Sequence, residues 1–274
     1  MRIFIAKINI NENIFKNNYK ELIPFIGDAV LAKKNIKTIH SNSEWTFGET
    51  KEINNNGNRL ISGKLYRLKE NKKEKEWDEV EHKGKKIDKI FAFESKFLFD
   101  VNSELIVFQE TDEISKEAFN LVFGNLCNMI DYRIGKLKLT LLTKTVEIES
   151  LLKEYNKVYY AKFNIIPANH NSNNGFSKLD DIIKEDQIEE ITTTMKNEHG
   201  NIAITEGSIF AGFFKLVKSG YGTVKIIVGK KDSKKEGKKT INSQEYLHKK
   251  SIKEEEFEEK SIELLKEVKN LRNK

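Results

Sequence analysis

A cluster of lysines late in the chain is the group of residues whose type and spacing point most clearly to chemistry. It follows an apolar, glycine-punctuated segment, and only Asp232 and Glu236 oppose it. The lysines are Lys215, Lys218, Lys225, Lys230, Lys231, Lys234, Lys235, Lys238 and Lys239. Such a surface attracts a polyanion, so we expect these lysines to bind nucleic acid, with the Tyr221 ring available for stacking on a base.

The segment Ser219-Gly220-Tyr221-Gly222 within this region has two interpretations. One is a left-handed glycine cap that ends a helix over residues 208–218 and leads into a strand over 223–228. The other is a loop that cradles a phosphate, which requires glycines ahead of a helix so that free amides point at the anion. Here the glycines follow the predicted helix, and the order favours the cap.

Three residues in the middle of the chain suggest an enzymatic alternative. Glu94 and Lys96 are spaced as Glu-x-Lys on a predicted strand, with Asp88 upstream. This arrangement superficially matches metal-dependent nucleases, in which carboxylates hold Mg²⁺ and a lysine helps to position water. The chain is rich in Glu and Lys, so the same spacing arises several times by chance. We therefore predict no catalytic set and keep Asp88, Glu94 and Lys96 as the alternative.

Metal and cofactor chemistry has little support in the sequence. The five histidines are scattered without helical pairing or cysteine partners, and no zinc site or cofactor is expected. Cys127 is the single cysteine and lies in an apolar run, which predicts a packed helix residue. One cysteine excludes an intramolecular disulfide and suits a reducing compartment.

Composition places the chain among globular proteins with a polar surface. Of 274 residues, 33% are charged, and the net charge is +6. Residues 1–100 carry 20 basic and 15 acidic side chains, residues 101–200 carry 11 and 16, and residues 201–274 carry 17 and 11, so +5 − 5 + 6 gives the total. A lysine- and asparagine-rich chain can also reflect an AT-rich genome, which weakens the argument from overall charge. No signal peptide or apolar run of about 18 residues is present, which predicts a cytoplasmic protein that does not span a membrane.

Apolar periodicity predicts an α+β fold, with mixed, mainly antiparallel sheets and helices packed on one face. Three regions are expected: residues 1–88, β-rich with a charged arm; 89–168, a central ββαβαβ domain; and 169–274, an α/β region with a basic hairpin and a terminal helix. The expected strands cover 2–10, 37–47, 58–69, 89–101, 104–109, 136–142, 158–166 and 223–228, and the expected helices cover 113–133, 146–155, 177–199, 208–218 and 251–271. The turn-rich run Asn54-Asn55-Asn56-Gly57 predicts that the strands over 37–47 and 58–69 form a hairpin with an Asn-Gly turn.

Several segments together resemble a loose group of bacterial and prophage proteins found among abortive-infection and phage-exclusion genes. The resemblance rests on the N-terminal Ile-Phe-Ile-Ala-Lys-Ile strand, on Ile61-Ser62-Gly63-Lys64, on the strands from Phe91 to Glu110, and on the glycines from Gly212 to Gly229. The group is similar to the phage-exclusion protein RexA and the defence protein KwaB, and more distantly to the recombination protein RdgC. The resemblance implies a homodimer that binds DNA largely independently of sequence in anti-phage defence, together with a partner defence protein.

Three hypotheses about function follow from these observations. The first is DNA binding through basic surfaces in the outer thirds of the chain, with the acidic middle turned away. The second is an enzyme, either a metal-dependent nuclease that uses Glu94 and Lys96 or an RNA-acting toxin. The third is a non-enzymatic interaction component of a defence system, in which the apolar stripe of the terminal helix docks on a partner.

Overall fold

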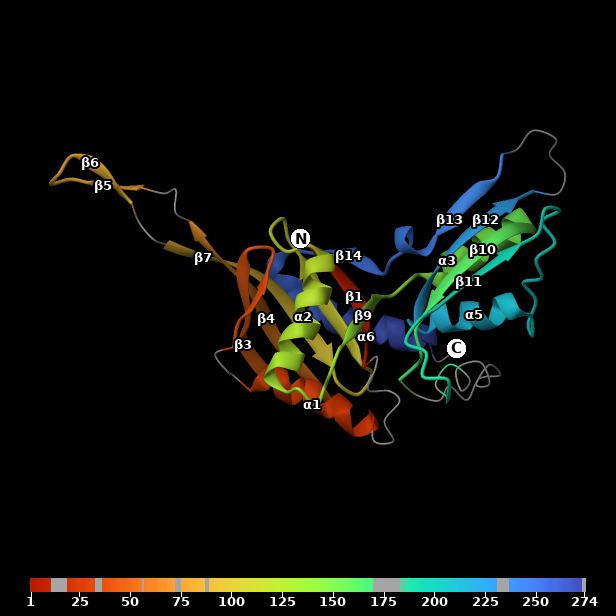
Figure 1. Ribbon diagram of the computed structural model, residues 1–274, viewed down its shortest axis with the longest axis horizontal. Helices are drawn as coiled ribbons and strands as arrows, with labels where there is room; N and C mark the ends of the chain where they lie inside the picture. Colours follow the sequence, from red (N-terminus) through yellow and green to blue (C-terminus); the bar gives the residue numbers. More distant parts are fainter. Residues whose placement is uncertain are drawn as a thin grey trace.

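The computed structural model describes residues 1–10, 19–32, 36–55, 57–71, 75–86, 89–169, 183, 185–230 and 237–272. These residues form two lobes, each built on its own antiparallel sheet (Figure 1). The helices are α1 (Tyr19–Leu31), α2 (Lys116–Ile130), α3 (Thr145–Tyr155), α5 (Ile209–Lys218) and α6 (Phe257–Arg272), with 3-10 turns η2 (Ser243–Glu245) and η3 (Glu254–Glu256). The strands are β1 (Arg2–Asn9), β2 (Thr38–His40), β3 (Ser43–Asn55), β4 (Asn58–Asn71), β5 (Lys75–Asp78), β6 (Lys83–Lys86), β7 (Lys89–Asp100), β8 (Leu105–Glu110), β9 (Lys138–Leu141), β10 (Lys157–Ile165), β11 (Ile191–Lys196), β12 (Gly222–Gly229), β13 (Lys239–Asn242) and β14 (Lys249–Ser251).

The larger sheet has eight strands among the described residues, in the order β14-β1-β8-β7-β4-β3-β2, with β9 also paired to β1. The predicted hairpin with an Asn-Gly turn is confirmed as β3 and β4. Gly57 has φ +82° and donates its amide to the Asn54 side chain at 3.3 Å, which fixes the turn. The α+β class with mainly antiparallel pairing is therefore confirmed, and every strand pair within the described ranges is antiparallel rather than mixed.

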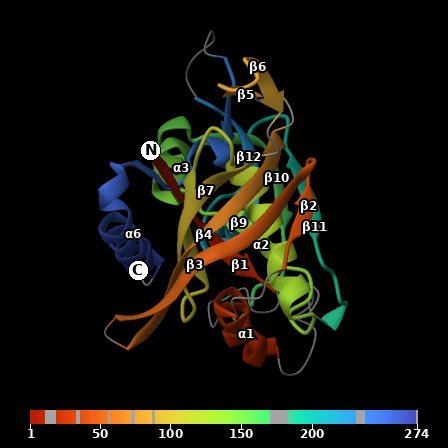
Figure 2. The same cartoon turned by 90° about the vertical axis from the view of Figure 1, so that its left-hand side faces the viewer.

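Helices cover both faces of the larger sheet, whereas the sequence predicts one covered face (Figure 2). Strand β1 shows why: Phe4, Ala6 and Ile8 point to α1 and α2, while Ile3 and Ile5 point to α6. Phenylalanines dominate the first side, where the rings of Phe108 and Phe119 stack 4.1 Å apart. Hydrophobic residues on both sides of one strand therefore build two separate cores.

The terminal helix α6 buries its apolar stripe against its own sheet. Phe257, Leu264, Leu265 and Val268 are all less than a tenth exposed and pack with the strands of the larger sheet. The nearly buried Asp100 at the end of β7 pairs with Lys269 of α6. The stripe predicted as a docking surface is thus occupied within the chain, and the interaction hypothesis loses its main support.

The smaller sheet has the order β11-β10-β12-β13, with α3 and α5 on one face. Ala161 and Phe163 of β10 and Val224 and Ile226 of β12 contribute to the core on that face. The helix predicted over residues 208–218 is confirmed as α5, which begins at Ser208, whose side chain accepts the Ala211 amide. For this sheet the expectation of helices on one face holds.

Two sequence predictions differ from the observed arrangement. Residues 191–196 form strand β11 instead of the end of a helix over 177–199, because the run Thr192-Thr193-Thr194 favours extended backbone and pairs with β10. Residues 177–182 and 184 of that predicted helix lie outside the described residues, and residues 186–190 and 197–199 are not helical. The proposed central domain over 89–168 is also divided, since β7, β8 and β9 join the larger sheet and β10 joins the smaller one.

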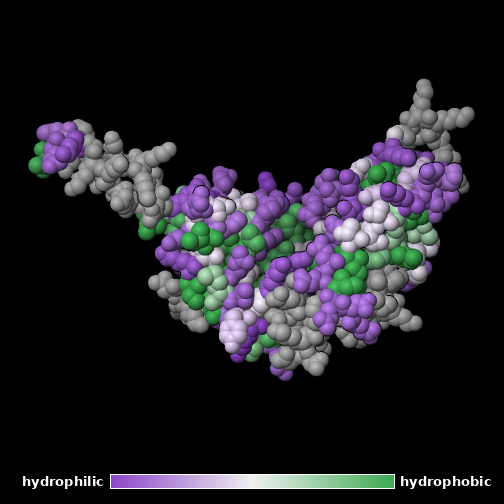
Figure 3. All heavy atoms as spheres, viewed as in Figure 1, coloured by the Kyte–Doolittle hydropathy of each residue, from purple (hydrophilic) through white to green (hydrophobic). Residues whose placement is uncertain are grey.

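The charged arm predicted for the first region is described over residues 75–86. It contains a two-stranded ribbon, β5 and β6, that extends beyond the larger sheet from the ends of β4 and β7 (Figure 1). Figure 3 shows that the upper margin between the two lobes is hollowed and lined mainly by hydrophilic residues. Among the described residues, none of the helices combines the length and apolar character needed to cross a bilayer.

A buried polar cluster joins the two lobes. The Lys7 ammonium of β1 lies 2.7 Å from a Glu104 carboxylate oxygen, and both side chains are at most 5% exposed. Asn169, which follows β10, donates to that carboxylate at 2.5 Å and to the Ile8 carbonyl at 2.8 Å, and it accepts the Ile10 amide at 3.2 Å. Because Asn169 follows β10 of the smaller sheet and bonds to Ile8, Ile10 and Glu104 beside the larger one, these hydrogen bonds tie the two lobes together.

The predicted glycine cap is confirmed at Gly220, which has φ +83° after α5 and packs against the same junction. A β-carbon there would lie 2.4 Å from Leu142 Cδ2 and 3.0 Å from Lys7 Cβ. Left-handed backbone and close packing both require glycine at this position.

We expect Gly220→Ala to lower the free energy of unfolding by about 2–5 kcal/mol, since it combines left-handed strain with overpacking at the lobe junction. The matched control is Gly57→Ala, where φ is +82° but no atom lies within 4 Å of the added methyl group. Its expected loss is only about 1–2 kcal/mol. Urea denaturation followed by circular dichroism gives both values, and equal losses would contradict the packing argument.

Candidate functional site

Three of the predicted lysines meet two tyrosines at one end of the smaller sheet, where β12 ends and β13 begins. Lys238 Nζ lies 4.3 Å from the centroid of the Tyr159 ring, within cation–π range. Lys230 Nζ and Lys239 Nζ lie 5.4 Å and 5.3 Å from the centroid of Tyr155, the last residue of α3. The chain thus builds a cationic, aromatic end of the sheet from α3, β10, β12 and β13.

Two glycines seat the Tyr159 ring. Tyr159 is the extra residue of a bulge in β10, so its side chain departs from the regular alternation of the strand. A β-carbon at Gly229 would lie 2.9 Å from the Tyr159 ring, and one at Gly200, where φ is +73°, would lie equally close. Only glycine allows the ring to lie this near the backbone at both positions.

The face of the smaller sheet opposite α3 and α5, which we call the outer face, is lined by lysine, threonine, asparagine and tyrosine. Successive side chains of a strand point to opposite faces of the sheet, so the residues that alternate with the buried core residues point to the outer face. Strand register arranges them in three rows across the sheet: Thr192, Asn164 and Thr223; Thr194, Lys162, Lys225 and Asn242; and Lys196, Tyr160, Ile227 and Thr240. All of these residues are exposed or half-buried.

The charge of the outer face is uncompensated. Strands β10, β11, β12 and β13 contain lysines but neither Asp nor Glu. Lys162 and Lys225 stand directly opposite each other on β10 and β12. Neither ammonium forms an ion pair with any residue that the structure describes. Like charges in opposite positions destabilise a sheet, and a bound anion would relieve that repulsion.

The remaining predicted binding residues do not join this face. Lys215 and Lys218 lie on α5, on the other side of the sheet, and pair with Glu206 at 3.8 Å and Glu149 at 3.5 Å. Tyr221 is only 5% exposed and packs in the core below the Lys7 ammonium, so the predicted stacking role is wrong. Lys231, Lys234 and Lys235 lie outside the described residues.

The basic segments of the two ends of the chain do not converge into one track. The β5–β6 arm and the β12–β13 hairpin lie at opposite ends of the long axis (Figure 1). The middle third is not turned away either, because it supplies Lys162 and Lys196 to the outer face. Sequence reasoning missed these two lysines because each stands alone in an apolar or threonine-rich strand. The signal that could have found them is the absence of acids from four neighbouring strands.

The alternative nuclease residues are tied up in ion pairs on the larger sheet. Lys64 lies between the carboxylates of Glu49, at 2.9 Å, and Glu94, at 3.0 Å. Hydrogen bonding to Glu49 raises the pKa of Lys64. Lys96 points to Glu254 at 2.9 Å, and Asp88 lies outside the described residues. Both Glu94 and Lys96 are therefore engaged in ion pairs with other residues of the chain.

Metal and thiol chemistry also find no site in the described part of the chain. Within it, no group of three or more His, Cys, Asp and Glu side chains could hold a metal ion. Cys127 is fully buried in α2, as predicted, and burial raises the pKa of its thiol. A protonated, buried thiol is a packing residue rather than a nucleophile.

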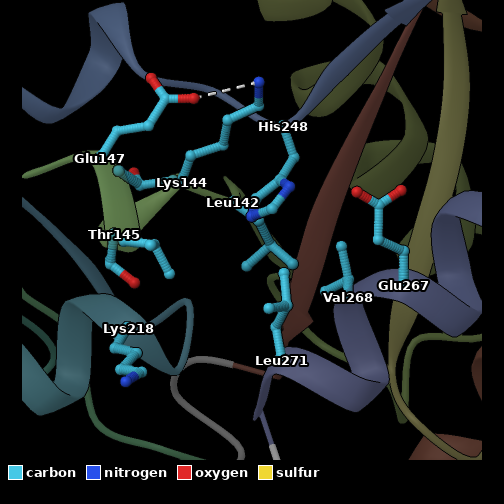
Figure 4. A pocket seen from close by; sticks show the side chains of 11 residues that line it. Leu142, Lys144, Thr145, Glu147, Lys218, His248, Glu267, Val268 and Leu271 are labelled. Carbon is cyan, nitrogen blue, oxygen red and sulfur yellow. Dashed lines mark ion pairs between the residues drawn. The ribbon is translucent and has the colours of Figure 1, made fainter.

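A pocket of about 320 Å³ lies between the lobes, where α3 begins (Figure 4). Lys144, Glu147, His248 and Glu267 line it together with apolar residues. Lys144 pairs with Glu147 at 3.3 Å, and Glu267 pairs with Lys250 at 2.7 Å, so the charged groups are largely neutralised within the protein. Burial, followed by the nearby Lys144 charge, lowers the pKa of His248.

Comparison with known proteins identifies a family for the whole of this fold. A family model described as a domain of unknown function, DUF4747, matches residues 1–270. The chain belongs to the DUF4747 family. No curated protein and no solved structure matches it. Membership in the DUF4747 family thus covers both lobes and the outer face, and the chemistry of the site must be argued from its own residues.

We expect the free energy of unfolding to fall as the pH is lowered from 7 to 5. The pKa of His248 is lower in the folded protein than its ordinary value of 6.5. As the pH falls below 6.5, the unfolded state therefore takes up the proton before the folded state does, and this uptake stabilises the unfolded state relative to the folded one. His248→Gln cannot take up this proton and should show a shallower fall. Urea titrations at each pH measure the slope, and identical slopes for both proteins would contradict this role of His248.

Proposed function

We propose that the protein binds DNA largely independently of sequence through the outer face of the smaller sheet and acts in anti-phage defence. One observation carries the binding proposal: Lys162 and Lys225 face each other across two strands of an acid-free sheet, without an ion-pair partner in the described part of the chain. An extended phosphate backbone supplies negative charge in the repeating form that such a face requires.

The side chains beside these lysines support binding without base selection. Threonine hydroxyls and asparagine amides occupy the positions around them, and such groups bind phosphate and sugar as readily as base edges. Lys238, which lies over the Tyr159 ring, adds positive charge at the β12–β13 end of the sheet. Nucleic acid bound along β10 and β12 would therefore remain near lysines throughout.

The defence role rests on the resemblance of the strand and glycine pattern to phage-exclusion and abortive-infection proteins. A homodimer, a partner defence protein and a cytoplasmic location belong to the same proposal.

Light scattering should then show twice the mass of one chain. In bacteria that carry the protein, phage plating should be reduced, and variants that lose DNA binding should restore it.

A salt series tests the binding proposal. We expect the logarithm of the DNA association constant to fall linearly with the logarithm of salt concentration. The combined variant Lys162→Gln, Lys196→Gln and Lys225→Gln should bind more weakly, with a slope less steep by about two to three, because each lost phosphate contact removes about one. Fluorescence anisotropy with a labelled oligonucleotide measures both quantities.

The matched control removes the same charge from the other side of the same lobe. Lys144→Gln, Lys215→Gln and Lys218→Gln change residues of α5 and of the pocket, each of which already has an ion-pair partner. This variant should keep the affinity and the slope nearly unchanged. Equal losses in the two variants, or affinity that does not respond to salt, would defeat the proposal.

A further inference from the structure

We propose that the outer face takes single-stranded rather than duplex DNA, with unpaired bases stacked on Tyr160 and Tyr159. This inference rests on the proposed function and specifies its substrate. Tyr160 lies on β10, an interior strand of the smaller sheet, where it stands opposite Lys196 on β11 and Ile227 on β12. A base that covers the Tyr160 ring would also cover Ile227, the only apolar residue among the three rows of the outer face described above.

The lysines around Tyr160 are placed for the phosphates on either side of a stacked base. Lys196 is its direct cross-strand neighbour, and Lys162 is two residues along the same strand, on the same face. A ring flanked by cations on two sides fits one nucleotide with its adjoining phosphates. Every base has a flat aromatic surface, so this contact does not depend on sequence.

Tyr159 provides a second ring, whose edge is fixed by Gly200 and Gly229 and which the Lys238 ammonium approaches at 4.3 Å. An incoming base can replace that ammonium on the ring, and the released lysine can then pair with the phosphate of the same nucleotide. The cation–π contact of the free protein is thereby exchanged for base stacking and an ion pair. The adjacent tyrosines of the bulge would hold successive bases.

The dimensions of the sheet argue against a duplex. Strands lie about 4.8 Å apart, so β11 to β13 span roughly 14 Å between strand axes alone. The major groove of B-DNA is only about 12 Å wide and admits two strands at most. A duplex would therefore rest on the lysines by its backbone, and its bases, already stacked on one another, would make no use of the tyrosines.

Anisotropy titrations with one labelled mixed-sequence strand, alone and annealed to its complement, test this inference at fixed salt. The wild type should bind the single strand more tightly than the duplex. Tyr160→Ala should weaken single-strand binding about 5- to 100-fold and leave duplex binding unchanged, whereas Tyr160→Phe should retain single-strand binding. Tyr160→Leu keeps the apolar bulk without the ring, and it should bind as poorly as the alanine variant.

The control is Tyr132→Ala, which removes an 86% exposed tyrosine from the larger-sheet lobe and should change neither affinity. Equal wild-type affinities for both DNA forms, or a Tyr160→Ala variant that binds the single strand normally, would overturn the single-strand inference. If binding in that case still depends on Lys162, Lys196 and Lys225, the proposed function stands without it. If neither DNA form binds, both proposals fail.

Discussion

The arrangement of the molecule depends on the buried ion pair between Lys7 and Glu104. An ion pair nearly excluded from water stabilises the fold only when further hydrogen bonds satisfy its charged groups. Asn169 of the other lobe donates one such bond to the Glu104 carboxylate. Removing one partner of such a pair typically costs about 3–5 kcal/mol, because the other charge stays buried. Gly220 approaches the same lysine, so the turn between α5 and β12 is positioned by the pair as well. The start of β12, the strand that bears Lys225, is therefore positioned by contacts at the junction of the two lobes.

The smaller sheet combines a strongly apolar face with a repulsive one. On the inner side, the centroids of the Phe210 and Phe213 rings lie 5.3 Å and 5.5 Å from that of Phe163, and this core stabilises the strands regardless of the outer residues. On the outer side, repulsion between the facing lysines Lys162 and Lys225 destabilises strand pairing by a smaller free energy, of the order of 1 kcal/mol or less. The core thus allows a binding surface to persist that would be unfavourable in an isolated hairpin. Sequestering the acids on α3, where Glu149 and Glu154 pair with Lys218 and Lys230, keeps the outer face positive.

Local signals made part of this structure predictable. The Asn-Gly hairpin, helix α5 with its Ser208 cap, the Gly220 turn and the buried Cys127 each depend on residues close in sequence. Strand β11 was mistaken for helix because Ile191 was grouped with the isoleucines before it in one helical stripe, and only pairing with β10 identifies the strand. The site was predicted in part: Lys225, Lys230, Lys238 and Lys239 were found from lysine density. Lys162, Lys196 and Tyr160 were not, since their meeting depends on register between strands more than 25 residues apart. The prediction for Tyr221 was wrong because this aromatic residue, although near lysines in the sequence, points into the core of the folded protein.

Strand β1 pairs with β8, β9 and β14, which come from progressively later parts of the chain. During synthesis on the ribosome, β1 is made before any of these partners, and its contacts with β14 and α6 can form only when almost the whole polypeptide has emerged. Pairing between such distant segments slows folding and prolongs the exposure of aggregation-prone surface. Completion of the larger sheet therefore waits for the last part of the polypeptide to be made.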